Sequence, residues 1–328
     1  MRKQPSPLFA VAIAVGILVA APAAAQHLRF ERAIDVTPGA TLDVSTIRGK
    51  VAVRADDGRQ IRIDGTVTVR AGVGGLTVPS NALELAQRVA DHPRIDVADN
   101  VVRLRPPIDA DELRAVTVSY EVRVPRDTRL VIATDSGAVT VNDMAAPVLV
   151  TTQSSTIDLS GINGATEIKT GSGAVKVDRA AGGLRVVTQS STITLRGLSG
   201  PLDARTHSGA VRASFAGPGA ADVETGSSAI QIDGLAGGLA VRTQSGRVDV
   251  RGYPTAAWNV TTGSSVIDVS LEPAARFTLD ATSRSSSVHL TGVAVDGVTA
   301  KERVSGTVGG GGPIVRLASR SGQIHIGH

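Results

Sequence analysis

The chain has six histidines, the residues best suited to binding a metal or moving a proton near neutral pH: His27, His92, His207, His289, His325 and His328. None stands in a metal-ligand spacing such as His-Glu-x-x-His. His289 and His325 occupy equivalent outward positions of a repeat, so we expect them to lie near each other on the surface. Because the spacing fixes no carboxylate beside them, we interpret both as solvated residues and predict no metal site.

Carboxylates are the second group of residues that could do chemistry. Polysaccharide lyases and hydrolases often use β-helices, and they need long loops that form a cleft around paired carboxylates or a calcium site. Here Asp158, Asp249 and Asp268 fall at an outward position that Lys176 and Arg212 share in other repeats. The turns are tight, and the calcium-binding repeat Gly-Gly-x-Gly-x-Asp is missing. We therefore predict that the protein is not an enzyme.

Motifs for nucleophiles and nucleotides are also missing. Thr170-Gly171-Ser172-Gly173 lies at a repeat corner, and no Gly-x-Ser-x-Gly elbow is followed by Asp and His. The glycine run at 309–312 lacks the lysine and serine of a phosphate-binding loop. Trp258 and Phe277 fall at apolar positions that we expect to be buried, where they could not stack on sugars. We predict no catalytic, cofactor-binding or metal-binding residues and no cofactor.

The residues above belong to a repeated phrase: apolar-x-apolar-x-Thr-x-Ser-Gly/Ser, followed by apolar-x-apolar. Its serines lie 18 or 19 residues apart, with longer gaps before the last two: Ser136, Ser154, Ser172, Ser190, Ser208, Ser227, Ser245, Ser264, Ser285 and Ser321. A short fixed period of this kind indicates a solenoid. Each period contains two segments that alternate apolar and polar residues, as strands with one buried face do.

Stacking like residues on like predicts an all-β fold: a parallel β-solenoid, similar to a right-handed β-helix, with about 18 residues per coil. The inward residues that follow the serines are expected to stack in chain order: Val139, Ile157, Val175, Ile193, Val211, Ile230, Val248, Ile267, Val288 and Ile324. Two residues before each of the first eight serines stands a threonine that shares the parity of the buried positions: Thr134, Thr152, Thr170, Thr188, Thr206, Thr225, Thr243 and Thr262. Ice binding would need such threonines to face solvent, so we expect their hydroxyls to bond within the corners.

The flanking regions differ from the repeat. We divide the chain into a signal peptide (1–25), a strand-rich capping region (26–128) and the solenoid (129–328), with a loop or side hairpin interrupting the period at 293–312. In the capping region we predict one helix over 80–91, capped by Ser80 and ended before Pro93. Such a cap would protect the open edge of a solenoid.

The first 25 residues have the pattern of an export signal. Arg2 and Lys3 precede an apolar run at 8–20, and three alanines at 23–25 give the small residues that signal peptidase requires. A retained membrane anchor is the alternative, but the run is short for a span. Cleavage before Gln26 would lower the net charge from +4 to +2, which does not imply a nucleic-acid partner. The chain has no cysteine, so it has neither disulfides nor thiolate metal ligands.

Together these features resemble a bacterial putative-adhesin family of unknown function with β-strand repeats. The stretches that carry the resemblance are Ser-Tyr-Glu-Val-Arg-Val-Pro at 119–125, the repeated Ser-Gly-x-Val-x-Val, and the ending at 310–326. The resemblance covers most of residues 40–328 and implies an envelope or surface location with an adhesive role. It brings no active-site motif.

Two functions follow from these observations. The first is an exported, non-enzymatic scaffold, periplasmic, on the cell surface or secreted, which presents a rigid face to envelope or extracellular proteins or polysaccharides. The second is a carbohydrate-active enzyme whose cleft is formed by the N-terminal region and the 293–312 loop. After signal cleavage we expect no membrane span.

Overall fold

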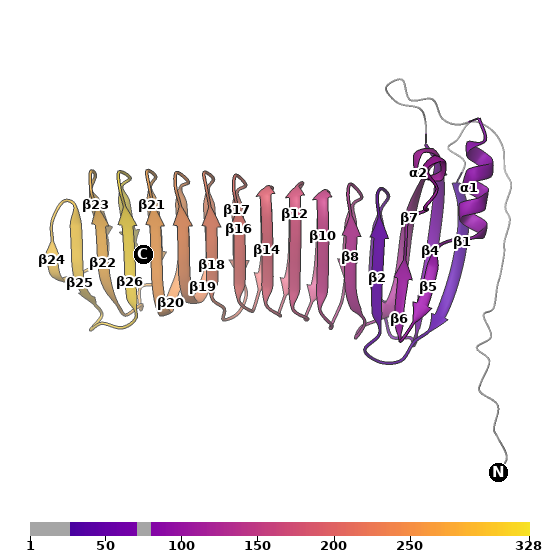
Figure 1. Ribbon diagram of the computed structural model, residues 1–328. Helices are drawn as coiled ribbons and strands as arrows, with labels where there is room; N and C mark the ends of the chain where they lie inside the picture. Colours follow the sequence, from indigo (N-terminus) through magenta and orange to yellow (C-terminus); the bar gives the residue numbers. More distant parts are fainter. Residues whose placement is uncertain (1–26, 71–79) are drawn as a thin grey trace, which may run out of the picture.

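The computed structural model describes residues 27–70 and 80–328, which are mostly β-strand with two helices. The strands stand side by side in one long row (Figure 1). The predicted signal peptide lies outside the described residues, and its cleavage stays a prediction. Within the described ranges, neither helix has the length and apolar character that crossing a membrane requires.

Each coil contributes one strand to each of two hydrogen-bonded ladders, which we call ladder A and ladder B. Ladder A runs, in spatial order, through β6 (Val101–Leu104), β2 (Thr41–Thr46), β8 (Arg129–Thr134), β10 (Val148–Ser154), β12 (Thr166–Ser172), β14 (Leu184–Ser190), β16 (Leu202–Thr206), β18 (Ala221–Thr225), the end of β19 (Ile230–Thr243), the end of β20 (Val248–Thr262), β26 (Ile314–Ser319) and β22 (Phe277–Ser283). All of these pairings are parallel.

Ladder B runs beside it. Its parallel part comprises β7 (Val116–Pro125), β3 (Val51–Asp56), β9 (Val139–Asn142), β11 (Ile157–Ile162), β13 (Val175–Ala180), β15 (Ile193–Leu198), β17 (Val211–Phe215), the starts of β19 and β20, β21 (Ile267–Leu271), β27 (Ile324–Gly327) and β23 (Val288–Thr291). β19 and β20 run through a corner and therefore belong to both ladders.

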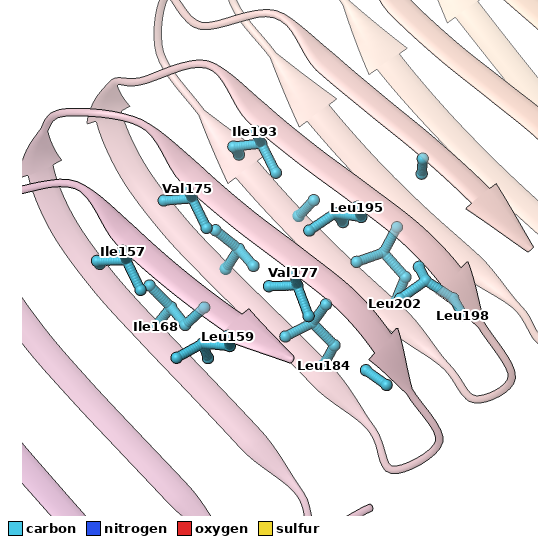
Figure 2. Close-up of a cluster of buried hydrophobic side chains, with 14 of the residues drawn as sticks. Ile157, Leu159, Ile168, Val175, Val177, Leu184, Ile193, Leu195, Leu198 and Leu202 are labelled. Carbon is cyan, nitrogen blue, oxygen red and sulfur yellow. The ribbon is translucent and has the colours of Figure 1, made fainter. Parts of the chain in front are cut away.

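The core lies between the two ladders as a stack of short apolar side chains. Inward residues of ladder B such as Ile157 and Val175 meet inward residues of ladder A such as Ile168 and Leu184 (Figure 2). Neighbouring coils pair in register, as Ile157 does with Val175, so each apolar residue repeats at the strand spacing. The period of two keeps charged residues outside. These observations confirm the predicted all-β parallel solenoid.

The last coil of the chain is not the last coil of the stack. β26 lies between β20 and β22, and β27 lies between β21 and β23. Figure 1 shows the C-terminus inside the row of strands. The predicted stacking in chain order is therefore wrong at this end: Ile324 pairs with Ile267 on one side and with Val288 on the other.

A packing constraint at the corners accounts for this order. The residue that follows each of the ten repeat serines alternates along the stack between glycine and serine. In spatial order these residues are Gly137, Ser155, Gly173, Ser191, Gly209, Ser228, Gly246, Ser265, Gly322 and Ser286. A Cβ built on Gly322 would lie 1.8 Å from the carbonyl oxygen of Ser265, and one on Gly209 would lie 1.6 Å from that of Ser191. Glycine is required wherever a coil rests on a serine coil, and the C-terminal coil keeps this alternation.

The N-terminal end is covered by antiparallel strands and two helices. β1 (His27–Asp35) pairs with β4 (Gln60–Val69), β4 pairs with β7, and β5 (Ile95–Ala98) pairs with β6. The predicted helix is present as α1 (Ala82–Asp91), but its N-cap is Asn81 and not Ser80. A second helix, α2 (Ala110–Ala115), corrects the expectation of one helix.

The sequence hid α2 because it is short and lacks a clear apolar stripe, although its N-cap is well formed. The Asp109 carboxylate accepts bonds from two backbone N–H groups, those of Asp111 and Glu112. The proposed boundary at residue 129 stays a prediction. Parallel ladders run across it, since β2 and β3 pair with β8 and β9.

The interruption at 293–312 contains an antiparallel hairpin. It consists of β24 (Asp296–Thr299) and β25 (Arg303–Val308), and β25 continues ladder A by pairing antiparallel with β22. Gly309, Gly310 and Gly311 follow with positive φ angles and turn the chain back toward β26. The hairpin therefore covers the last strand of ladder A and returns the chain into the stack.

Candidate functional site

The corner between ladders A and B holds its threonines inside. Thr134, Thr206 and Thr243 are nearly fully buried, and their Oγ1 atoms accept bonds from the N–H groups of the glycines three residues later at 3.0–3.2 Å. In other coils the hydroxyls bond each other, as Thr152 and Thr170 do at 2.8 Å. The threonines are buried as predicted, and the predicted internal bonds are present in several coils but not at Thr225 and Thr262, whose buried Oγ1 atoms have no partner among the described residues. Buried hydroxyls of this kind cannot meet a surface ligand.

The serines two positions later face solvent and form a continuous ridge. We call Ser136, Ser154, Ser172, Ser190, Ser208, Ser227, Ser245, Ser264, Ser321 and Ser285 the serine ridge. Two adjacent pairs lie within hydrogen-bond distance, with 3.1 Å between the Oγ atoms of Ser172 and Ser154 and 3.4 Å between those of Ser208 and Ser190. Exposed glutamines at several preceding positions, such as Gln153 and Gln189, add amide donors and acceptors.

At its C-terminal end the ridge borders an open groove of about 660 Å³, which we call the arginine groove. Thr261 and Ala318 belong to its lining, and Gln244, Arg284 and Arg320 border it. Small side chains on neighbouring strands make room for the hollow. Neither arginine lies within ion-pair distance of a carboxylate in the described residues, so both guanidinium groups can bind an oxyanion.

Outside the arginine groove, charged side chains on the outward face of ladder A form ion pairs with one another. Arg185 contacts Asp203 at 2.6 Å, Lys169 contacts Glu167 at 2.9 Å, and these pairs repeat along the face. Lys169 and the nearby Arg185 lower the pKa of the Glu167 carboxyl, with the hydrogen bond from Lys169 as the main cause. Such exposed pairs contribute little stability. Most charged side chains of this face are therefore in ion pairs, whereas the two arginines of the arginine groove are in none among the described residues.

The outward carboxylates considered for catalysis lie on ladder B. Asp249 and Asp268 are register neighbours, and Asp158 lies several coils away. Asp268 is occupied by Arg247 at 2.6 Å and by His325 at 3.0 Å, and Asp249 lies 3.8 Å from Arg251. None of the three lines any of the five hollows found in the described residues. Trp258 and Phe277 are fully buried, as expected.

A smaller cavity of about 210 Å³ lies in the N-terminal region, between α1, α2 and the strands beneath them. Burial raises the pKa of the Tyr120 phenol in its wall to about 12. Of the cations beside it, Arg88 contacts Glu112, Arg105 bonds Asp43 at 2.8 Å, and Arg94 donates to the Pro106 carbonyl oxygen at 2.9 Å. This cavity therefore offers an incoming anion less than the arginine groove does.

The structure places the six histidines in three kinds of environment. His289 and His325 are neighbours with ring centroids 5.4 Å apart, as the repeat predicted. Inserting β27 next to β21 brings Asp268 against His325, so a carboxylate stands where the sequence spacing showed none. Of the other histidines, His27, His92 and His328 lie near the ends of the structure, and His207 lies on the exposed corner.

Two parallel ladders that enclose a stacked apolar core define the fold of a repetitive β-solenoid. The chain belongs to the Toastrack DUF4097 family, whose pattern matches residues 50–327. No curated protein matches the sequence.

Several solved structures are similar to this chain at low sequence identity, including the following three. A "putative cell adhesion protein" from Clostridium sporogenes is 11% identical, covers 92% of this chain and 99% of its own, and has a TM-score of 0.23. A "putative adhesin" from Parabacteroides distasonis is 10% identical over 91% and 97%, with a TM-score of 0.28. A "putative lipid binding protein" from the same organism is 13% identical over 91% and 96%, with a TM-score of 0.23.

Proposed function

We propose that this chain is an exported, non-enzymatic envelope protein that acts as an adhesin-like scaffold, binding acidic polysaccharide along the serine ridge and in the arginine groove. The observation that carries the proposal is the exposed polar ridge that borders a groove with two unpaired arginines. The sequence features that resemble an export signal support the location outside the cytoplasm, either in the periplasm or at the cell surface.

A repetitive polymer matches a repetitive surface. Hydroxyl and amide groups recur along the ridge at the strand spacing of about 4.8 Å. A polysaccharide presents hydroxyls at a comparable repeat, and many weak bonds can then form together. Because ladder A is self-neutralised, the charge that selects an acidic polymer is concentrated in Arg284 and Arg320.

The test is direct binding of untagged protein to immobilised polygalacturonate, with dextran as the neutral polymer. We expect retention on polygalacturonate that weakens with salt and little retention on dextran. The Arg284→Ala/Arg320→Ala double variant should bind several-fold more weakly. The matched control is Arg196→Ala/Arg212→Ala, which removes two arginines of ladder B that have no ion-pair partner among the described residues.

Two results would overturn the proposal. Equal loss in both double variants would mean that general charge, and not the groove, causes binding. Shortening of the polysaccharide on incubation with the protein would support the carbohydrate-active enzyme instead.

A further inference from the structure

We propose that His289 and His325 form a binding site for a divalent transition-metal ion, with Asp268 holding His325 in the binding orientation. The two histidines lie on neighbouring coils, and Asp268 reaches His325 because the C-terminal coil lies between the coils of β21 and β23. It lies on ladder B and is independent of the arginine groove.

The two rings have the spacing that a shared ion needs. With nitrogen–metal bonds of about 2.0–2.1 Å, two imidazoles on one tetrahedral ion have centroids about 5 Å apart. The centroids of His289 and His325 are 5.4 Å apart, with the ring planes at 66°. His289 is exposed and His325 is partly exposed, so an ion can reach them from solvent.

Both Nε2 atoms point toward the same end of their strands. Nε2 of His289 lies 2.7 Å from Oγ of Ser287, and Nε2 of His325 lies 3.2 Å from Oε1 of Gln323. Ser287 and Gln323 are neighbours, because the N–H of Ile324 donates to the Ser287 carbonyl. An ion at this end would meet two imidazole nitrogens and an amide oxygen, and water would complete its shell.

Asp268 fixes the tautomer of His325. Its Oδ1 lies 3.0 Å from Nδ1, and since a carboxylate can only accept, Nδ1 carries a proton. In the neutral ring Nε2 then has a lone pair for the ion, which takes the place of the proton that the Gln323 oxygen would otherwise require there. The other oxygen, Oδ2, lies 2.6 Å from Nη2 of Arg247, which holds the largely buried carboxylate in place. A carboxylate bonded to the far nitrogen of a ligating histidine is the usual support of a metal site.

Within the described residues, no three His, Cys, Asp or Glu side chains gather closely enough to hold a metal. The proposed site therefore has two imidazole ligands and an amide, and its affinity should be modest. Imidazole nitrogen favours Zn²⁺, Ni²⁺ and Cu²⁺ over Mg²⁺ and Ca²⁺.

The experiment is isothermal titration of untagged protein with Zn²⁺, and with Mg²⁺ as the unsuitable ion. We expect one Zn²⁺ per chain and no Mg²⁺ binding. His289→Ala and His325→Ala should each abolish the measurable site, and Asp268→Asn should weaken it about tenfold. The control is His207→Ala, which removes an exposed histidine elsewhere and should leave Zn²⁺ binding unchanged.

Thermal melting without metal separates binding from folding, and each histidine variant should melt as the wild type does. Zn²⁺ should raise the melting temperature of the wild type and of His207→Ala only. Zn²⁺ binding that persists in His289→Ala, or that is absent from the wild type, would overturn the site.

Discussion

The middle of the stack and its C-terminal end are built from the same repeat but differ in how the chain is ordered. From β10 to β18, each coil rests on the coil that precedes it in sequence, and outward charges pair across neighbouring strands. At the C-terminal end, β26 and β27 enter between earlier coils. The arginine groove and the histidine pair both lie there.

The difference shows that a sequence repeat determines the register of neighbouring strands more firmly than it determines the spatial order of the coils. Where coils follow the chain, residues at one position have the same neighbours as in the repeat alignment. The insertion creates neighbours that the alignment does not contain, such as Asp268 beside His325. The charged groups that acquire such new neighbours therefore lie at the end where the order breaks.

The most decisive test of the difference between the two regions is to crosslink neighbouring strands at the C-terminal end and so establish their order. The chain has no cysteine, so two introduced thiols are the only ones present. Asn259 and Arg316 are register partners about 5 Å apart, whereas Asn259 and Asp280 are separated by β26 at about 10 Å. We expect a short crosslinker with two thiol-reactive groups to join Asn259→Cys with Arg316→Cys almost completely.

The companion variant joins Asn259→Cys with Asp280→Cys and should remain unlinked. Mass spectrometry of tryptic fragments reads both outcomes. Efficient joining of the second pair alone would show that the coils follow chain order and would separate Asp268 from His325.

In the middle of the stack, burial should dominate stability. Val186 is fully buried in ladder A, and Val186→Asp would place a carboxylate among apolar side chains, at a cost of about 3–5 kcal/mol. The matched control is Val187→Asp, one residue along, which faces outward between Lys169 and Arg205. It should be close to neutral in urea denaturation, and equal losses in the two variants would contradict the assigned register.

At the C-terminal end, the corner glycine should matter more than a glycine in open space. Gly322→Ala forces a Cβ toward the Ser265 carbonyl oxygen, and we expect a loss of about 2–3 kcal/mol. At Gly183 the nearest heavy atom to a built Cβ is Cγ of Pro201 at 3.6 Å, so Gly183→Ala should unfold at nearly the wild-type urea concentration. A harmless Gly322→Ala would show that the alternation does not govern the insertion.

The smallest effect is expected at the opposite end, where Asp43 of β2 bonds Arg105. This hydrogen bond, opposed by partial burial and helped by the charge of Arg105, lowers the pKa of the Asp43 carboxyl. Because its pKa is lower in the folded protein, the Asp43 carboxyl stabilises the fold at pH values above its unfolded pKa of about 3.9. This stabilisation is lost as the pH falls through the folded pKa. Asp43→Asn should therefore cost on the order of 1 kcal/mol at neutral pH and less in acid, as measured by urea denaturation.

Much of this structure could be predicted from the residues alone. The period of two and the serine spacing gave the ladders, the buried threonines and the outward charges, because each depends only on local sequence and on stacking like on like. The order of the last coils depends on a close backbone approach that no propensity describes. The signal was present, however, in the alternation of glycine and serine that ends in Ser265, Gly322 and Ser286.

The site was harder to predict than the fold. His289 and His325 could be placed together, but chain order would have placed Asp268 beside His289 and not beside His325. The arginine groove was not predicted, because a hollow between side chains leaves no periodic signal in the sequence. α2 was missed because one turn and a half of helix gives almost no periodic signal.

The inserted coil also sets a direction on folding. A chain that emerges N-terminus first can add coils one by one as far as β21, but until residues 314–327 arrive the coil of β22 and β23 has only the antiparallel strand β25 as a partner. The final residues therefore complete the assembly in a single late step. A chain without residues 314–327 would leave two facing rows of unsatisfied backbone groups, which proteases and chaperones recognise.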